Sequence, residues 1–170
     1  MLFLLFQLGH DRYALDASRV VEVVPLVTVK GLPQAPRGWA GVFNYRGQPV
    51  PAVDLCELTT GRPARECLST RIIVVRHPGA QGEDQLLGLI AEHATQMMRR
   101  DAKDFVASGV RADRAPYLGP MMPDGGGWIQ WLHEDRLLSN GTREALSKQL
   151  REAGEDFGTR DRRDQEPTEK

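Results

Sequence analysis

The sequence predicts an all-β fold, either a barrel or a sandwich. Short apolar runs recur along most of the 170-residue chain, and 17 glycines and 11 prolines fall largely between them. Runs of this kind, bounded by Gly and Pro, are typical of strands joined by tight turns. The chain also has two halves with a similar order of elements, closing on Asp54-Leu55 and on Asp135-Arg136-Leu137. The pattern therefore favours two similar barrels with a boundary in the linker 59–69.

The first hairpin is predicted over residues 2–16. Residues 2–8 are a continuous apolar run, the polar turn Gly9-His10-Asp11 ends it, and residues 13–16 supply the returning strand. The β-branched run 18–25 follows and predicts a short helical turn or a strand. Residues 28–38 are expected to form a loop because they contain four residues that interrupt regular structure: Gly31, Pro33, Pro36 and Gly38.

The most informative stretch is 41–55, which predicts a strand, a tight turn and a second strand. The turn is 45–48, because Gly47 can take the positive φ that several turn types need at their third position. Pro49 and Pro51 lack N–H donors and lie two residues apart, so the missing donors face one edge of the strand. That edge should be a sheet edge, a barrel seam or a place where strand pairing stops.

The turn places Arg46 at or beside the hairpin tip, with its side chain free to reach a partner. The local sequence leaves two interpretations open. One is an ordinary solvated turn arginine; the other is an anchor for a carboxylate or a helix C-terminus on a partner protein. The planar guanidinium group with its five donors suits the second role.

In the second half, the clearest strand is 71–76, which is short, β-branched and bounded by charge. Residues 86–91 should return beside it, and 94–98 are expected to continue into another strand. A second strand pair is predicted at 116–119 and 128–132, ahead of a helical turn at 133–138. The chain should end in a short helix over 139–152 and a charged, disordered tail over 153–170.

Composition argues against nucleic acid as a partner. The formal net charge is −1, with 22 Lys and Arg against 23 Asp and Glu, and aromatic residues make up only 6% of the chain. A protein that binds nucleic acid needs a basic surface, and a site for single strands also needs exposed aromatic side chains. A small β-barrel that binds single-stranded nucleic acid is kept as an alternative function.

No catalytic or metal-binding pattern stands out. The four histidines lie far apart and have no metal-ligand spacing with Cys56 and Cys67, which are expected to be small buried or half-buried free thiols. The nearby acids Asp54 and Glu57 should cap or flank a helical turn. We expect a protein that is not an enzyme and that uses no metal and no cofactor; an unrecognised enzyme is a further alternative.

The apolar start of the chain, residues 1–6, predicts a buried first strand. A membrane span needs about 20 apolar residues, and a signal peptide needs a basic start, a longer apolar run and a small-residue cleavage site. Polar residues follow at once from Gln7. A cytoplasmic protein is therefore expected.

Taken together, these segments resemble the CheW-like domain, the coupling module of bacterial chemosensory arrays. The most specific match is Gly-x-x-Asn-x-Arg-Gly-x-x-x-Pro-x-x-Asp-Leu over 41–55, and the opening hairpin, Val20-x-Glu22-Val23 and the segments 87–92 and 117–138 match in order. The resemblance covers about residues 1–138. It implies two side-by-side barrels without enzymatic activity, the first over about 1–58 and the second over about 70–138.

The resemblance also implies partners. Members of this family join methyl-accepting chemoreceptors to the regulatory domain of the histidine kinase CheA, and the helical tip of the receptor lies in an apolar groove between the barrels. This mode of binding would recruit the protein to receptor arrays at the membrane. The residues that match positions at or near that groove are Arg46, Val20, Gly41, Asn44 and Gly47, and Leu87 and Leu89 lie where the second barrel would line it.

Three features depart from the family pattern. Tyr45 stands where Leu or another aliphatic residue is usual, two prolines (Pro120 and Pro123) lie in the closing hairpin, and the tail past Ser139 is extra. With the apolar start and the segment 115–120, these departures suggest an accessory pathway of the Wsp surface-sensing type, which controls a diguanylate cyclase and biofilm formation. A coupling protein of flagellar chemotaxis is the alternative.

Overall fold

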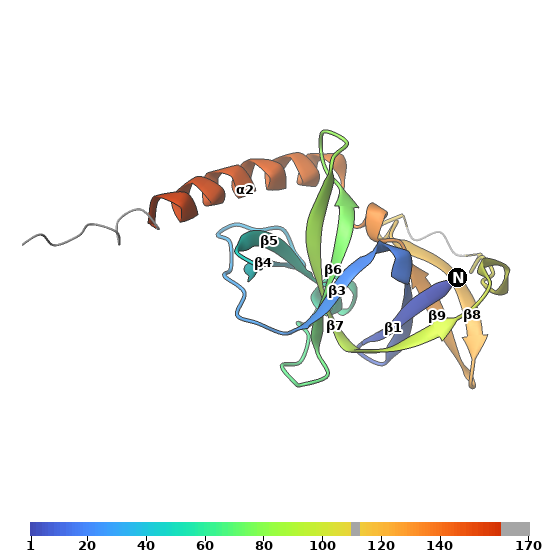
Figure 1. The fold of residues 1–170 in the computed structure, drawn as a ribbon. Helices are drawn as coiled ribbons and strands as arrows, with labels where there is room; N and C mark the ends of the chain where they lie inside the picture. The colour runs from blue at the N-terminus through green and yellow to red at the C-terminus, as the bar shows by residue number, and fades with distance from the viewer. Residues whose placement is uncertain (110–112, 161–170) are drawn as a thin grey trace, which may run out of the picture.

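The computed structural model describes residues 1–109 and 113–160. Nine strands within these ranges form one sheet in the order β3-β6-β7-β1-β2-β9-β8, with β5 paired to β7 and β4 paired to β5. The sheet curls into two barrels that lie side by side (Figure 1). The prediction of a mostly β fold is confirmed.

The element boundaries follow the predicted pattern of short strands and turns. The strands are β1 (Leu2–Leu8), β2 (Asp11–Asp16), β3 (Val20–Pro25), β4 (Trp39–Tyr45), β5 (Gln48–Asp54), β6 (Arg71–Pro78), β7 (Asp84–Arg99), β8 (Leu118–Asp124) and β9 (Gly127–Leu132). The helical segments are η1 (Ala17–Arg19), α1 (Leu55–Thr60), η2 (Ala102–Asp104), η3 (Glu134–Arg136) and α2 (Asn140–Arg160).

One barrel, here named the terminal barrel, contains β1, β2, β8, β9 and the second half of β7. β1 pairs antiparallel with both β2 and β7, and β2 pairs parallel with β9. An isolated bridge between Val106 and Met121 joins the segment after β7 to β8 and completes the circuit. Inside, the fully buried ring of Phe3 lies against Phe105 and Trp131, at centroid distances of 5.1 and 4.9 Å.

The other barrel, the middle barrel, contains β3, β4, β5, β6 and the first half of β7. β6 pairs antiparallel with β3 and β7, and β5 pairs parallel with β7 and antiparallel with β4. Phe43, Val50, Ile72 and Val74 fill its interior. β3 pairs only with β6 among the described strands, so a seam runs between its other edge and the β4–β5 hairpin.

The long strand β7 belongs to both barrels. Its residues 84–91 pair with β6, and residues 92–99 pair with β1. Where the strand crosses over, His93 has a φ of +50°, and the register with β1 shifts between Leu5 and Gln7. A bulge bends a strand and increases its twist, and the rare positive φ marks the same point. This bend carries β7 from the middle barrel into the terminal barrel.

The strand pairing corrects the expected division into a first barrel over 1–58 and a second barrel over 70–138. β1 and β2 lie in the terminal barrel with β8 and β9, whereas β6 lies in the middle barrel with β3. The prediction assumed that strands pair within each half of the chain. It fails because β7 is long enough to complete one barrel and to continue into the other.

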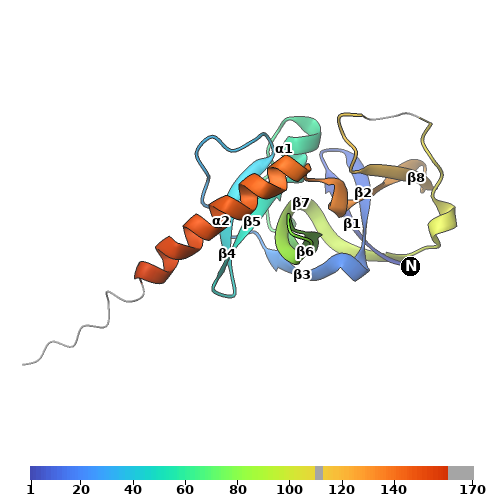
Figure 2. The ribbon, with the colours of Figure 1, turned by 90° about the horizontal axis from the view of Figure 1, so that it is seen from above.

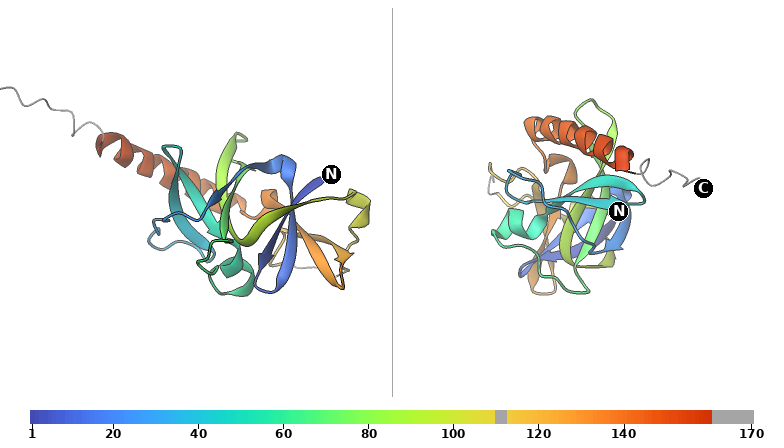
Figure 3. Two further views of the ribbon diagram at one scale, coloured as in Figure 1. Left: turned by 60° about the horizontal axis from the view of Figure 1, so that its bottom comes forward. Right: turned by 90° about the vertical axis from the view of Figure 1, so that its left-hand side faces the viewer.

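The C-terminal helix is longer than expected. α2 runs from Asn140 to Arg160, so residues 153–160, which were predicted to be disordered, are helical. The rest of that predicted tail, 161–170, lies outside the described residues. Figures 2 and 3 show α2 running alongside β4 and β5. Leu146 is buried in the main core and Leu150 packs against it, so the helix is docked on the barrels.

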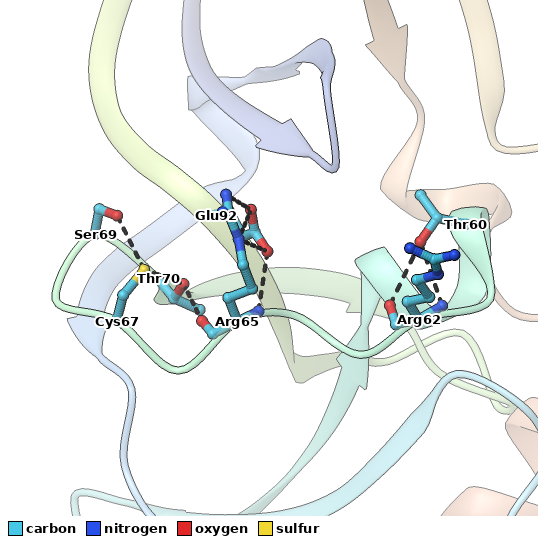
Figure 4. Close-up of polar contacts among 7 residues, drawn as sticks. All are labelled: Thr60, Arg62, Arg65, Cys67, Ser69, Thr70 and Glu92. Carbon is cyan, nitrogen blue, oxygen red and sulfur yellow. Dashed lines mark hydrogen bonds and ion pairs between the residues drawn. The ribbon is translucent and has the colours of Figure 1, made fainter.

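The linker between α1 and β6 is held by two buried carboxylates. Asp54 caps α1 by accepting from the backbone N–H of Glu57 at 3.0 Å, and it also accepts from the N–H of Ala64 at 2.8 Å. Glu92 accepts from the backbone N–H of Arg65 at 2.9 Å and pairs with its guanidinium at 3.0 Å (Figure 4). The predicted capping role of Asp54 is thus confirmed, and the linker is fixed at both barrels.

Both cysteines are free thiols, as expected, but they differ in environment. Cys56 is buried in the core, where burial raises the pKa of its thiol to about 11. Cys67 lies exposed in the linker, and contacts of 3.3 Å from its sulfur to the hydroxyls of Ser69 and Thr70 lower its pKa to about 7 (Figure 4). The expectation of a buried or half-buried thiol is wrong for Cys67, because the linker turns it outward.

His77 on β6 is buried, and its position makes stability depend on pH. Its Nδ1 lies 2.8 Å from the carbonyl oxygen of Pro78, while Nε2 has no hydrogen-bond partner among the described residues. Burial is the largest effect, and it lowers the pKa of His77. The Pro78 carbonyl and Asp135 on η3 oppose this shift, whereas Arg143 on α2 and Arg19 on η1 add to it.

We therefore expect acid to destabilise the protein through His77. The unfolded chain binds the proton near the usual pKa of about 6.5 and the folded protein resists it, so stability falls as the pH drops through this value. His77→Asn keeps an amide that can donate to Pro78 and should show a smaller loss of Tm between about pH 7.5 and pH 5 than the wild type. His10→Gln, at an exposed turn, is the control; equal pH profiles for wild type and His77→Asn would refute this assignment.

Candidate functional site

The tip of the β4–β5 hairpin is a two-residue turn. Arg46 has a φ of +51° and Gly47 a φ of +82°, which is the pattern of a type I′ turn. The side chain of Asn44 stabilises it by accepting from the backbone N–H of Gly47 at 2.8 Å. Asn44 and Gly47, both predicted as partner-binding residues, therefore have a structural role that presents Arg46 at the tip.

The two prolines of β5 act as predicted. Pro49 and Pro51 stand opposite Asn44 and Val42 on β4, and pairing with β7 on the other edge begins only at Ala52. Because proline has no N–H to donate, the first half of β5 cannot form a regular ladder on that edge. The hairpin tip therefore projects beyond the part of β5 that pairs with β7.

Arg46 is engaged with the neighbouring strand rather than fully free. Its Nη2 donates to Oε2 of Glu22 on β3 at 2.9 Å, and the hydroxyl of Tyr45 donates to the same oxygen at 2.5 Å. The guanidinium carbon also lies 5.4 Å from the centre of the Tyr45 ring. We call Glu22, Tyr45 and Arg46 the seam cluster, because it joins the hairpin to the unpaired edge of β3.

The pKa shifts of Glu22 and Tyr45 agree with the hydrogen bonds of the seam cluster. The hydrogen bond from Tyr45 is the largest cause of a lowered pKa at Glu22, and the charge of Arg46 lowers it further. The same hydrogen bond raises the pKa of Tyr45. Glu22 is thus a carboxylate and Tyr45 a neutral phenol at neutral pH. The side chain of Arg46 is still 73% exposed, so most of its surface faces solvent.

A cleft lies on the middle barrel beside the hairpin. It has a volume of about 230 Å³ and is largely apolar. Its lining comes from the segment before β4 and from the hairpin itself: Thr28, Lys30, Leu32, Val42, Phe43, Asn44, Gly47, Gln48 and Pro49. Two predicted site residues, Asn44 and Gly47, therefore border an apolar cleft next to Arg46. The expected groove lay between the barrels, whereas this cleft lies on one of them.

Gly41 is required by the fold. It has a φ of +137°, and a Cβ at this position would lie 1.9 Å from the carbonyl oxygen of Lys30. The backbones approach so closely because Lys30 and Val42 exchange two hydrogen bonds, at 2.8 and 2.9 Å. Val20, at the start of β3, is half-buried and packs against the main core. Both residues thus contact the fold itself, Gly41 through the Lys30 backbone and Val20 through the core.

The remaining two predicted site residues are in the core. Leu87 is 1% exposed and Leu89 is 0% exposed, and both belong to the main hydrophobic cluster. Alternation along a strand cannot tell an inward core position from a groove position, and here both side chains point inward. The structure therefore does not support the expectation that Leu87 and Leu89 line a partner groove.

Sequence reasoning missed Glu22 and Tyr45 as members of the site. Tyr45 was noted only as a departure from the family pattern, and Glu22 only as part of a matching segment. They lie 23 residues apart and meet because β3 and the hairpin face each other across the seam. Tyr45 carried the one available signal, since a phenol at a largely buried strand end needs a hydrogen-bond acceptor.

Within residues 1–109 and 113–160, no group of three or more His, Cys, Asp or Glu side chains is placed to hold a metal ion. In the same part of the chain, no helix is long and apolar enough to cross a membrane. The site is a polar cluster beside an apolar cleft, built from β3, the β4–β5 hairpin and the segment before β4. Such a surface suits binding to another protein.

Comparison with known proteins identifies the family. The family model for the CheW-like domain matches residues 2–141, which include every strand of both barrels. The chain belongs to the CheW-like domain family. It is similar to the structure titled scaffolding protein TtCheW from Thermoanaerobacter tengcongensis, with a TM-score of 0.67 and 25% identity, covering 77% of this chain and 82% of that chain.

Two relatives named chemotaxis protein CheW also match. The protein of Helicobacter pylori is 32% identical over 104 residues, which are 61% of this chain and 59% of the relative, so the match spans about three fifths of that relative's length. The protein of Treponema pallidum is 26% identical over 145 residues, covering 79% of this chain and 80% of the relative. The two-barrel CheW-like fold and the family are therefore shown.

Proposed function

We propose that this protein is a non-enzymatic coupling protein that links methyl-accepting chemoreceptors to a CheA-type histidine kinase. The observation that carries the proposal is the CheW-like match over residues 2–141. The relatives named chemotaxis protein CheW and the similar structure titled a scaffolding protein support it. In this role the protein works in the cytoplasm and is recruited to membrane receptor arrays. The partner contacts are the receptor's cytoplasmic tip and the kinase's regulatory domain.

Arg46 is proposed as the anchor for the receptor. Among the described residues, one hydrogen bond, to Glu22, uses one of its five donors, and the side chain is 73% exposed. The remaining donors suit a carboxylate or the carbonyl end of a helix, and the apolar cleft beside the turn offers area for an amphipathic helix. Arginine anchors of this kind are enriched among residues that dominate binding energy.

Arg46→Ala is expected to weaken binding to a receptor cytoplasmic fragment by at least about tenfold, because a side chain that dominates binding is worth about 2 kcal/mol or more and tenfold is about 1.4 kcal/mol. Binding to the CheA-type kinase should be retained. Titration calorimetry with each purified partner measures both. Arg62→Ala, an exposed arginine of the linker, is the matched control, and circular dichroism checks that each variant folds.

Each outcome of this experiment is informative. A wild type that binds neither the receptor fragment nor the kinase would overturn the coupling proposal and leave a shared fold alone. A wild type that binds both, with Arg46→Ala unchanged, would retain the coupling function and remove Arg46 from the receptor site. Binding of single-stranded DNA instead of either protein would favour the nucleic-acid alternative.

The more specific form of the proposal is an accessory pathway of the Wsp surface-sensing type. It is supported by the sequence resemblance and by the helix α2, which begins at Asn140 and extends beyond the family match. The alternative is flagellar chemotaxis, the pathway of the general coupling protein. Complementation separates them: rescue of a strain lacking the Wsp-type coupling protein, without rescue of one lacking the flagellar protein, is the expected result.

A further inference from the structure

We propose that Tyr45 is the positioning residue of the seam cluster: its hydroxyl holds the Glu22 carboxylate so that Arg46 keeps donors free for a carboxylate on the partner. This inference deepens the proposed function and rests on it for the identity of the partner. The geometry that carries it is the sharing of one oxygen, Oε2 of Glu22, by two donors.

Tyr45 is itself firmly placed. It is the last residue of β4, is 9% exposed, and belongs to the core of the middle barrel. Its ring meets that of Phe43 in an edge-to-face contact with a centroid distance of 6.4 Å. The hydroxyl is therefore held at the barrel surface by a packed ring. It donates to Glu22 from a position that the packed Tyr45 ring fixes.

The Tyr45 hydroxyl controls how Arg46 meets Glu22. Arginine and carboxylate groups prefer a two-point contact, in which two N–H donors face two oxygens. Here the contact is made through one nitrogen and one oxygen, Arg46 Nη2 and Glu22 Oε2, at 2.9 Å. The 2.5 Å bond from Tyr45 fixes the orientation of the carboxylate. Without the hydroxyl, the carboxylate would be free to turn both oxygens toward the guanidinium.

The ring of Tyr45 guides Arg46 in a second way. The guanidinium carbon lies 5.4 Å from the ring centre, within the range of a cation–π contact. The backbone of Arg46 also has a positive φ, which few residues other than glycine adopt, so the turn sets the direction in which its side chain leaves the backbone. The guanidinium is thus restrained by the ring and by one hydrogen bond, which lowers the entropy lost when a partner binds.

These contacts assign a chemical class to the partner group. An exposed guanidinium with one hydrogen bond to the described part of the chain offers an edge with two adjacent donors, which matches a carboxylate. The cleft beside the turn is largely apolar, and Lys30 in its lining adds a second positive charge. We therefore infer a partner segment with an acidic side chain next to apolar ones, and Tyr45 sets the strength of that contact.

Tyr45→Phe tests this inference, because it removes the hydroxyl and keeps the packed ring. In the free protein, the change should produce a two-point contact between Arg46 and Glu22. Rotation of the Arg46 guanidinium about its Nε–Cζ bond, measured by ¹⁵N NMR, should then slow. Tyr13→Phe, a buried tyrosine of the terminal barrel, is the control and should leave this rotation unchanged. Unchanged rotation in Tyr45→Phe would overturn the inference whether or not any receptor binds.

Binding supplies the second readout. Tyr45→Phe should weaken binding to the receptor fragment about fivefold, the effect of one modest hydrogen bond. Adding Tyr45→Phe to Arg46→Ala should cause no further loss, because Tyr45 acts through Arg46. A full fivefold loss in the Arg46→Ala background would show a purely structural role and refute the inference. If the wild type fails to bind the receptor while the NMR change occurs, the proposed function fails and the positioning role stands.

Discussion

Gly41→Ala is expected to lower the free energy of unfolding by about 3–5 kcal/mol. A residue other than glycine held at a strained positive φ costs about 1–3 kcal/mol, and the two backbone hydrogen bonds at risk are worth about 1 kcal/mol each. The new Cβ would lie 1.9 Å from the carbonyl oxygen of Lys30, which is backbone and cannot rotate away. The segment before β4 must therefore move, and its bonds to Val42 are lost.

Gly47→Ala is the matched control, because it lies on the same hairpin at a positive φ of +82° but has no atom within 4 Å of the added Cβ. Only the conformational penalty applies, about 1–2 kcal/mol. Urea unfolding followed by circular dichroism compares the two variants. Similar losses for both would show that the close contact at Gly41 is relieved without cost, and that the Lys30–Val42 bridge is not important for stability.

The structural role of Gly41 means that a loss of binding in a Gly41 variant does not identify it as a receptor contact. Gly41 was predicted as a receptor-groove residue, yet its backbone contact explains why glycine is needed there without any partner. A weaker receptor complex in a Gly41 variant is thus expected from displacement of the segment before β4. Arg46 differs, because its side chain is exposed and its removal leaves the turn residues Asn44 and Gly47 in place.

Local chemistry explains what the sequence could predict. The hairpin at 45–48 follows from Gly47, and the interrupted edge of β5 follows from Pro49 and Pro51; both are properties of neighbouring residues. Asp54 caps α1 through Glu57, three residues away, which is also a local pattern. Such features need no knowledge of tertiary structure. The turn and its arginine were therefore found from sequence alone.

Features that join distant segments could not be predicted in this way. The bond between Tyr45 and Glu22 depends on two strands facing each other across a seam. The division of the barrels depends on the bend of β7 at His93, which has a positive φ that is uncommon outside glycine. Whether Leu87 and Leu89 point inward or outward depends on which face of β7 packs against the core, and in the structure both are buried. Each of these needs the tertiary arrangement, which periodicity does not contain.

Deleting α2 is expected to destabilise the protein strongly, contrary to the view of the C-terminus as an accessory tail. Leu146 is 5% exposed and lies in the main core with Leu138. The side chain of Arg143 donates to the carbonyl oxygen of Leu138 at 3.1 Å, and Gln85 on β7 donates to the hydroxyl of Ser147 at 3.3 Å. The helix thus covers core side chains and is bonded to the elements beneath it.

Leu146→Ala alone should cost about 2–4 kcal/mol, the range for a buried leucine whose removal leaves a cavity. Truncation after Ser139 should cost more, because Leu150 is lost as well and Leu138 becomes exposed. Glu144→Ala, at an exposed position of the same helix, should be close to neutral. Thermal unfolding of the three variants beside the wild type measures these differences.

Truncation after Arg160 separates the docked helix from the last ten residues of the chain. Residues 161–170 contain no large apolar side chain, so their removal should leave Tm unchanged. An unchanged Tm after truncation at Ser139 would show that α2 adds nothing to the core and would return the whole C-terminus to the role of a tail. A large loss only after truncation at Ser139 would make α2 an integral part of the fold. Its contact with β5 then ties the C-terminus to the strand pair that presents Arg46.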